Sequence, residues 1–108
     1  MSADNHMSVC INAYLDHIRA DYLKWAMDKK IHSVGLGTMA IEEGSKYLKV
    51  VRHDGQTMVH SFIVRKDTER FKKGDILKAA TWSAPATNFV RGNIFKGDFS
   101  RIRWTGAN

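Results

Sequence analysis

Apolar side chains recur at every third or fourth position of residues 5–31, which is the spacing of one face of an α-helix. Met7, Ile11, Ile18 and Tyr22 mark this stripe. The stripe is wide and partly aromatic, so it has to be buried against a sheet of the same domain, against a partner helix or in a homodimer. The sequence therefore predicts one long amphipathic helix over these residues.

Beyond this helix the hydrophobic pattern changes to a period of two, which is typical of β-strands. Glu42 and Glu43 are expected in a polar turn between the first two strands. Residues 83–93 form either a short helix, begun by Ser83 and ended by Gly92, or a long polar loop. The expected strands cover residues 34–40, 47–53, 57–65, 76–82, 93–95 and 99–104.

Asp54-Gly55 lies between two alternating segments and favours a two-residue hairpin turn, because both turn positions take positive φ angles. Such a turn pairs His53 with Gln56 and Lys49 with His60. One face of the hairpin is then apolar and belongs in the core, formed by Leu48, Val50, Val59 and Ile63. The other face is mixed, formed by Tyr47, Lys49, His53, His60 and Phe62, and we expect the N-terminal helix to cover it. If left exposed, it would resemble the aromatic and basic sheet faces of RNA-binding modules.

The chain of 108 residues is expected to form a single domain, residues 1–108. Its order of elements predicts an α+β fold, in which one long N-terminal amphipathic helix packs on a small, strongly curved antiparallel sheet or partly open barrel of about five strands. Parallel strands are not expected, because the segments between strands are too short for crossover helices.

The net charge of +6 is unevenly distributed. Residues 1–64 carry seven Lys or Arg and seven Asp or Glu, whereas residues 65–108 carry ten and four. The whole excess, ten minus four, therefore lies in the last 44 residues. Such asymmetry indicates a surface for a polyanion, although a basic surface can also serve solubility alone.

Aromatic, cationic and amide side chains alternate between Trp82 and Trp104, a composition typical of proteins that hold single-stranded nucleic acid. We expect at least three of the five rings in this segment to be buried. If Phe99, Arg101 and Arg103 share an outward strand face, two guanidinium groups flank a ring. The expected binding residues are Lys49, Lys72, Lys73, Trp82, Asn88, Phe89, Arg91, Asn93, Lys96, Arg101 and Arg103.

Two other functions are compatible with the sequence. The basic surface could dock on an acidic surface of another protein and inhibit it. A small enzyme acting on phosphate esters could use His60 or His53 as its base, although the expected register keeps the two apart and we expect no catalysis.

Other chemistries find little support. The one cysteine, Cys10, is expected to be a small core residue, and the five histidines are scattered without zinc spacing, so no metal or cofactor is expected. No apolar run approaches the roughly 18 residues of a membrane span, and residues 1–6 lack the pattern of a signal peptide. Together with the single cysteine, these features predict a cytoplasmic location.

Overall fold

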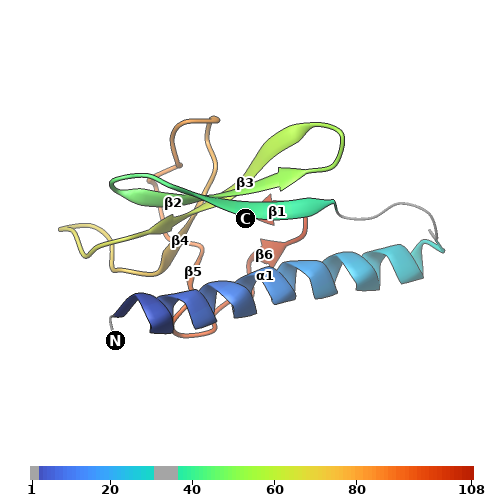
Figure 1. Ribbon diagram of the computed structural model, residues 1–108, viewed down its shortest axis with the longest axis horizontal. Coiled ribbons are helices and arrows are strands. Elements are labelled where there is room, and N and C mark those ends of the chain that lie inside the picture. Colours follow the sequence, from blue (N-terminus) through green and yellow to red (C-terminus); the bar gives the residue numbers. More distant parts are fainter. Residues whose placement is uncertain (1–2, 31–36) are drawn as a thin grey trace.

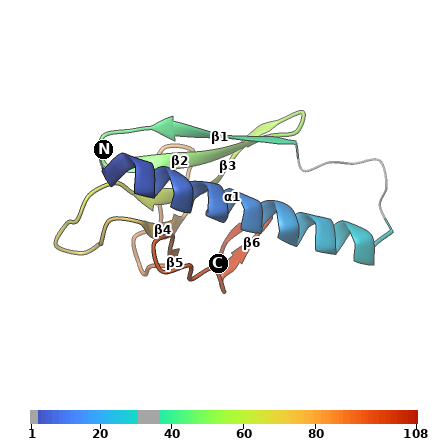
Figure 2. The same ribbon diagram turned by 60° about the horizontal axis from the view of Figure 1, so that its bottom comes forward.

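The computed structural model describes the backbone of residues 3–30 and 37–108 and, within these ranges, the side chains from His6 onward. One long helix lies across one face of a twisted antiparallel sheet (Figures 1 and 2). The two edge strands of this sheet are not paired with each other, so it is partly open. The structure is thus the α+β arrangement that the hydrophobic pattern predicts.

The helix α1 covers Ala3–Asp28. Its fully buried side chains include Tyr14 and Ile18, which belong to the stripe at helical spacing. The helix ends where Lys30 takes a φ of 55°, a left-handed conformation that commonly closes helices. Residues 31–36, in which the predicted end of the helix and the start of the first strand fall, lie outside the described residues.

The main sheet is an antiparallel meander in the order β1-β2-β3-β4-β5, and β6 and β7 form a separate two-stranded ribbon. In this ribbon β6 lies against α1, while β7 lies against β3 and β4. Glu42 and Glu43 belong to β1 rather than to a turn, because they pair with Lys49 and Leu48. The strands are β1 (Thr38–Glu43), β2 (Tyr47–His53), β3 (Thr57–Val64), β4 (Asp75–Lys78), β5 (Gly92–Asn93), β6 (Ile102–Arg103) and β7 (Gly106–Ala107).

The β2–β3 hairpin differs from the predicted register. His53 pairs with Thr57 rather than Gln56, so the turn contains three residues, in which Gly55 has a φ of 96°. A second irregularity follows, because Val51 pairs with Val59 whereas Val50 pairs with Ser61. The residue between them, His60, is the extra residue of a β-bulge.

The bulge moves His60 to the face of the sheet that α1 covers. Its ring lies 6.1 Å from that of Tyr14, and it contacts the backbone of Arg103 in β6. The predicted pair of Lys49 with His60 is therefore wrong, and Lys49 pairs with Phe62 instead.

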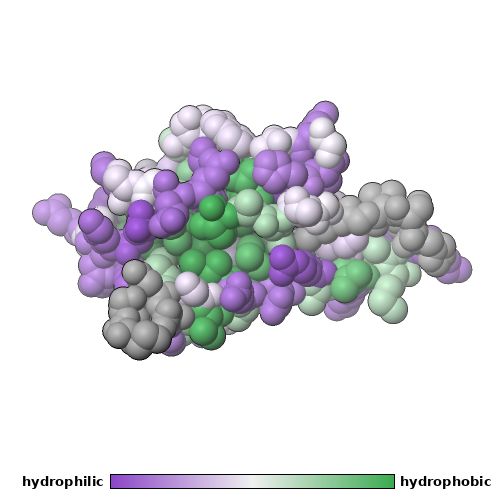
Figure 3. Space-filling view, viewed as in Figure 1, coloured by the Kyte–Doolittle hydropathy of each residue, from purple (hydrophilic) through white to green (hydrophobic). Residues whose placement is uncertain are grey.

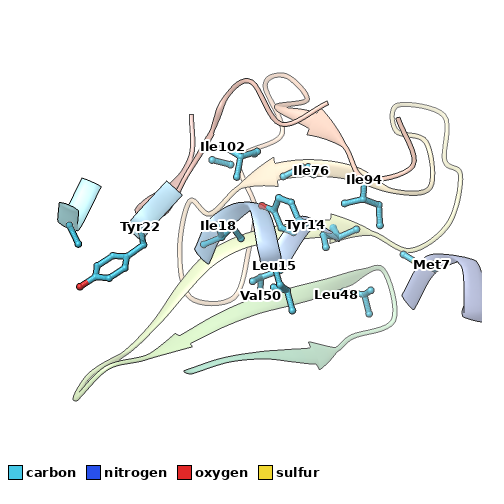
Figure 4. Packing of buried hydrophobic residues seen from close by; sticks show 13 residues of the cluster. Met7, Tyr14, Leu15, Ile18, Tyr22, Leu48, Val50, Ile76, Ile94 and Ile102 are labelled. Carbon is cyan, nitrogen blue, oxygen red and sulfur yellow. The ribbon is translucent and has the colours of Figure 1, made fainter. Parts of the chain in front are cut away.

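The main core fills the space between α1 and the sheet. Tyr14, Leu15 and Ile18 point from the helix toward Val50 of β2, while Ile102 approaches from the C-terminal ribbon (Figure 4). The predicted core positions Leu48, Val50 and Ile63 all belong to this cluster. Phe95, Phe99 and Trp104 are half-buried and pack against its margin.

A second apolar cluster occupies the opposite face of the sheet, where the mixed face was predicted. The helix does not cover this face, because α1 packs on the other one. The long segment between β3 and β5 contributes Phe71, Ala79 and Val90, which pack there against Phe62. Val59 also belongs to this second cluster rather than to the main core, because of the changed register.

The C-terminal third contains less regular structure than predicted. Residues 83–91 form a loop without a helix, and Pro85 within it makes an isolated bridge with Ala79. The pairing of the expected strands over residues 93–95 and 99–104 is reduced to one bridge between Asn93 and Asp98. Short strands joined by long loops leave many polar and charged side chains of this region at the surface.

Candidate functional site

The cations of residues 65–108 differ from those of the rest of the chain in their partners. Of these ten, only Arg65 forms an ion pair within the described residues, with Glu43. In residues 1–64, by contrast, three of the seven cations are paired. The charge excess is therefore carried by side chains whose charge no nearby carboxylate neutralises.

Two of the five rings of the aromatic segment are exposed. Trp82 is 47 % and Phe89 42 % exposed, whereas the other three pack against the core. The expectation that at least three rings are buried is met only in part, because these three are half-buried. Phe99 in particular packs between Tyr14 and His17 of α1, with ring centroids 5.5 and 5.1 Å away, so it does not share an outward face with Arg101 and Arg103.

Two guanidinium groups approach the exposed Phe89 ring instead. The central carbon of the Arg91 guanidinium lies 3.7 Å from the ring centroid, and that of Arg101 lies 5.2 Å away. These three residues form what we call the Phe89 cluster. The Phe-Val-Arg spacing of residues 89–91 could have indicated this pair, because alternate residues of an extended segment lie on the same side.

Arg91 is held in place by its own loop. Its Nη1 donates to Oδ1 of Asn88 at 2.9 Å and to the Phe89 carbonyl at 2.7 Å. Its Nε is buried and has no hydrogen-bond partner among the described residues. The residue is only 5 % exposed, so this positive group is partly desolvated, and it forms no ion pair with any described residue.

The electrostatics of the cluster favour an anion. Burial lowers the pKa of Arg91, and the neighbouring charge of Arg101 lowers it further. An arginine nevertheless stays protonated at neutral pH, so two like charges remain at one ring. An anion placed beside them would relieve their repulsion and accept charge-assisted hydrogen bonds.

A shallow hollow of about 160 Å³ lies beside the cluster, and Arg91, Arg101 and Lys96 are among its lining residues. The two acidic residues that line the hollow already accept hydrogen bonds. Asp75 accepts from the Lys72 backbone and the Asn93 amide at 2.8 and 2.9 Å, and Asp98 accepts from the Ser100 hydroxyl at 3.3 Å. The hollow is therefore lined by three cationic residues and by two acids that already accept hydrogen bonds.

Close backbone packing places Arg91 at this position. Its amide donates to the Ile76 carbonyl at 2.8 Å, which joins the loop to β4. At the next residue, a Cβ on Gly92 would lie 2.2 Å from the Asp98 carbonyl oxygen. Only glycine permits this approach, which brings the segments bearing Arg91 and Arg101 together.

The other exposed ring, that of Trp82, belongs to a separate site beside Lys49 of β2. The Lys49 ammonium lies 4.2 Å from the Trp82 ring centroid and 3.9 Å from a Glu42 carboxylate oxygen. This pair combines a cation with an exposed ring, as the Phe89 cluster does, but its charge is partly balanced.

The remaining predicted residues are more dispersed. The Asn93 side chain is buried and committed to the turn, because its Oδ1 accepts from the Phe95 amide at 2.8 Å. Lys73 is half-buried, with its ammonium 6.0 Å from the Phe95 ring centroid. Lys72 and Arg103 are exposed outside the cluster.

His60 is the centre of a hydrogen-bonded chain. Because a carbonyl can only accept, Nε2 donates to the Arg103 carbonyl at 2.7 Å. In the neutral ring, Nδ1 then accepts from the Ser61 hydroxyl at 2.8 Å, and Ser61 accepts from the Tyr14 hydroxyl at 2.6 Å. Burial raises the pKa of Tyr14 far above its usual value, so it stays protonated.

Burial, rather than this chain of bonds, keeps His60 neutral. Burial lowers its pKa to about 4, and the nearby charge of Arg52 acts in the same direction. Both ring nitrogens are occupied and the residue is 4 % exposed, so it has no free nitrogen to offer a substrate. His53 lies apart from it at the exposed turn, bonded to the Thr57 hydroxyl at 3.0 Å.

A larger groove of about 570 Å³, which the sequence did not indicate, separates the first half of α1 from the sheet. Figure 3 shows hydrophobic surface in the hollow above α1. The groove has an apolar floor and a mostly basic rim, and is lined by Met7, Ser8, Ile11, Asn12, Ile41, Glu43, Leu48, Arg65, Lys66 and Lys73.

Within residues 3–30 and 37–108, no three His, Cys, Asp or Glu side chains gather in a way that could hold a metal ion. In the same part of the chain, no helix has the length and apolar character required to cross a bilayer.

Comparison with known proteins gives a family but no function. No curated protein and no solved structure matches the chain. The sequence model of a family of unknown function, DUF7717, matches residues 3–107, which is nearly the whole chain. The protein therefore belongs to the DUF7717 family.

Proposed function

We propose that this protein is a non-catalytic binding protein for single-stranded nucleic acid and that the Phe89 cluster is its principal contact. The observation that carries the proposal is the pair of guanidinium groups at 3.7 and 5.2 Å from the centroid of an exposed phenyl ring. Proteins that bind single strands combine such cations, which contact phosphates, with rings on which bases stack.

The residues of the Phe89 cluster have different roles in the proposed contact. We expect Arg91, Arg101 and Lys96, which line the hollow, to contact phosphate oxygens there. The Phe89 ring is 42 % exposed and presents its uncovered surface, together with the planar guanidinium of Arg101, to a base. The Lys49–Trp82 pair supplies a second, weaker contact of the same kind.

A single strand fits this surface better than a duplex. Reading a duplex requires an element that enters a groove, whereas a ring flanked by cations contacts any unstacked base. The binding is expected to be tolerant of sequence. We place this activity in the cytoplasm, because a single cysteine suits a reducing compartment.

The test is a titration of fluorescently labelled oligothymidylate and oligouridylate, with a DNA duplex for comparison, followed by anisotropy. Phe89→Ala is expected to weaken single-strand binding by about 5- to 150-fold, equivalent to the roughly 1–3 kcal/mol of one stacked base. Arg101→Gln is expected to weaken it about tenfold or more through a lost charge-assisted hydrogen bond.

Lys29→Gln is the matched control, because it removes one charge at the exposed end of α1, away from the cluster. It should change the affinity little. Absence of binding to all of these nucleic acids at low salt would refute the proposal and leave an acidic protein surface as the partner to seek. If Lys29→Gln and Arg101→Gln weakened binding equally, the net charge of the protein, rather than the Phe89 cluster, would account for the affinity.

A further inference from the structure

A second apolar stripe runs along the solvent side of α1. Val9, Leu23 and Met27 are 66, 59 and 77 % exposed, although large apolar side chains on a solvated helix face are normally few. Small or acidic residues fill the positions between them. Spaced alternately by four and three residues, the outer stripe consists of Val9, Ala13, Asp16, Ala20, Leu23 and Met27, all exposed.

This outer stripe is opposite the core. Ile18 is fully buried and Met27 is nine residues later, which corresponds to about two and a half helical turns. The two therefore point in opposite directions. In Figure 2, α1 crosses in front of the sheet, and no described segment is drawn in front of it. Figure 3 shows hydrophobic surface on the half of α1 that ends at Asp28.

The spacing is that of a helix that packs against another helix. Residues repeated every four and three positions form the seam of a coiled coil, in which each side chain enters a hole on the facing helix. The fold of one molecule does not use this seam. We propose that the outer stripe pairs with the same stripe of a second copy of this chain, in antiparallel orientation.

Side-chain size favours this pairing. A two-fold axis at the level of Ile18 places Leu23 opposite Ala13 of the second copy and Met27 opposite Val9 of the second copy. Large side chains then face small or medium ones along the whole seam. The contact is isologous, as is usual in homodimers, and it lies on the side of α1 away from the sheet, where the two bodies do not collide.

Charge selects the antiparallel orientation. Asp16 and Arg19 form an exposed ion pair of 3.2 Å within one helix. In the antiparallel pair, Asp16 lies opposite Ala20 of the second copy and one position from Arg19 of the second copy, so two acids and two bases alternate around the axis. In a parallel pair Asp16 would face Asp16, which is destabilising.

The first test is sedimentation equilibrium over a range of protein concentrations. The short, partly alanine-lined seam is expected to give a reversible dimer with a dissociation constant on the order of 100 µM. Leu23→Lys should abolish it while leaving the circular dichroism unchanged, because the side chain is exposed. Met58→Lys is the matched control, since Met58 is also exposed, at 37 %, but lies in β3, and it should leave the dimer intact.

A charge exchange tests the centre of the seam. Asp16→Arg and Arg19→Asp should each weaken the dimer at least tenfold, because each gathers like charges around the axis. The double variant with both changes should restore it. Failure of the double variant to recover would contradict the proposed arrangement of charges.

Disulfide crosslinking tests the orientation. In a background with Cys10→Ser, a mixture of Ala13→Cys and Leu23→Cys proteins should form a mixed disulfide, and neither protein should crosslink with itself. Self-crosslinking of Ala13→Cys would indicate a parallel pair and overturn the proposal. A monomer at every concentration, or a dimer that survives Leu23→Lys, would also overturn it. The inference does not depend on nucleic-acid binding.

Discussion

His60 and Arg91 are both nitrogen-rich side chains that the fold withdraws from solvent, with exposed fractions of 4 % and 5 %. They lie in different regions, one beneath α1 and the other at the start of β5. The His60 ring has a partner at each nitrogen. Arg91 bonds only uncharged acceptors, leaves Nε unbonded and faces a second cation.

The difference separates a structural group from one available to a ligand. A buried polar group that is fully hydrogen-bonded stabilises the fold and has nothing left to offer. A buried charge without a counter-charge is costly, and a native protein keeps one mainly where a ligand completes the site. This contrast supports binding at the Phe89 cluster and removes the support that His60 gave to an enzymatic function.

The largest expected effect is a loss of stability in acid that depends on His60. Because its pKa falls from 6.5 to about 4 on folding, the unfolded chain binds the proton more tightly. The unfolding free energy should therefore decrease as the pH falls from about 6.5 to 4, by up to about 3 kcal/mol. Urea unfolding at a series of pH values measures this decrease.

His60→Gln isolates the contribution of His60 to this pH dependence, since glutamine keeps a donor and an acceptor but does not titrate. The stability of this variant should vary less over the same pH interval, so the difference between the two proteins should change as the pH falls from about 6.5 to 4. His53→Gln is the control, because this histidine is exposed at the turn. If the unfolding free energies of the natural protein and His60→Gln changed in parallel with pH, His60 would not be the source of the loss of stability in acid.

A smaller effect is expected from Arg91, and on binding rather than on stability. Arg91→Gln should weaken the binding of oligothymidylate about tenfold or more. It should change the unfolding free energy by less than about 1 kcal/mol, because removing a desolvated charge beside Arg101 offsets the hydrogen bonds it loses. Anisotropy and urea unfolding of the same variant measure both quantities.

The opposite result for Arg91→Gln, with stability reduced by several kcal/mol and binding unchanged, would remove the contrast between the two residues. Arg91 would then be a structural group like His60.

The smallest effect concerns the far end of the hydrogen-bonded chain. Tyr14→Phe removes the donor to Ser61 but leaves the bond from Ser61 to His60 in place. The unfolding free energy should decrease by about 1 kcal/mol, the contribution of one ordinary hydrogen bond. Tyr47→Phe, on the opposite face of the sheet, should have less effect. Calorimetry that ranks the two variants in reverse would contradict the network.

The sequence predicted the helix and the α+β class, because the change from a helical to a strand period is a local pattern. It failed on the hairpin register, since one bulge at His60 and one extra turn residue shift the pairing without altering the alternating pattern. The exchange of Val59 and His60 between the two faces follows from that shift.

The composition of the candidate site was predicted, but not its geometry. Alternating rings and cations indicated where to look, yet which ring stays exposed depends on contacts with distant elements. Phe99 packs on α1, and Phe89 does not, and neither outcome can be inferred from the neighbouring sequence. The burial of Asn93 likewise depends on Asp75 of β4.

The most direct test of the central claim is the mapping of a bound strand on the ¹H–¹⁵N spectrum of the protein during titration with oligothymidylate. If the strand binds at the Phe89 cluster, the largest shift changes should fall on the backbone amides from Asn88 to Arg101, with smaller ones around Trp82. Shift changes confined to α1 or to the groove between α1 and the sheet, or no changes at low salt, would contradict it.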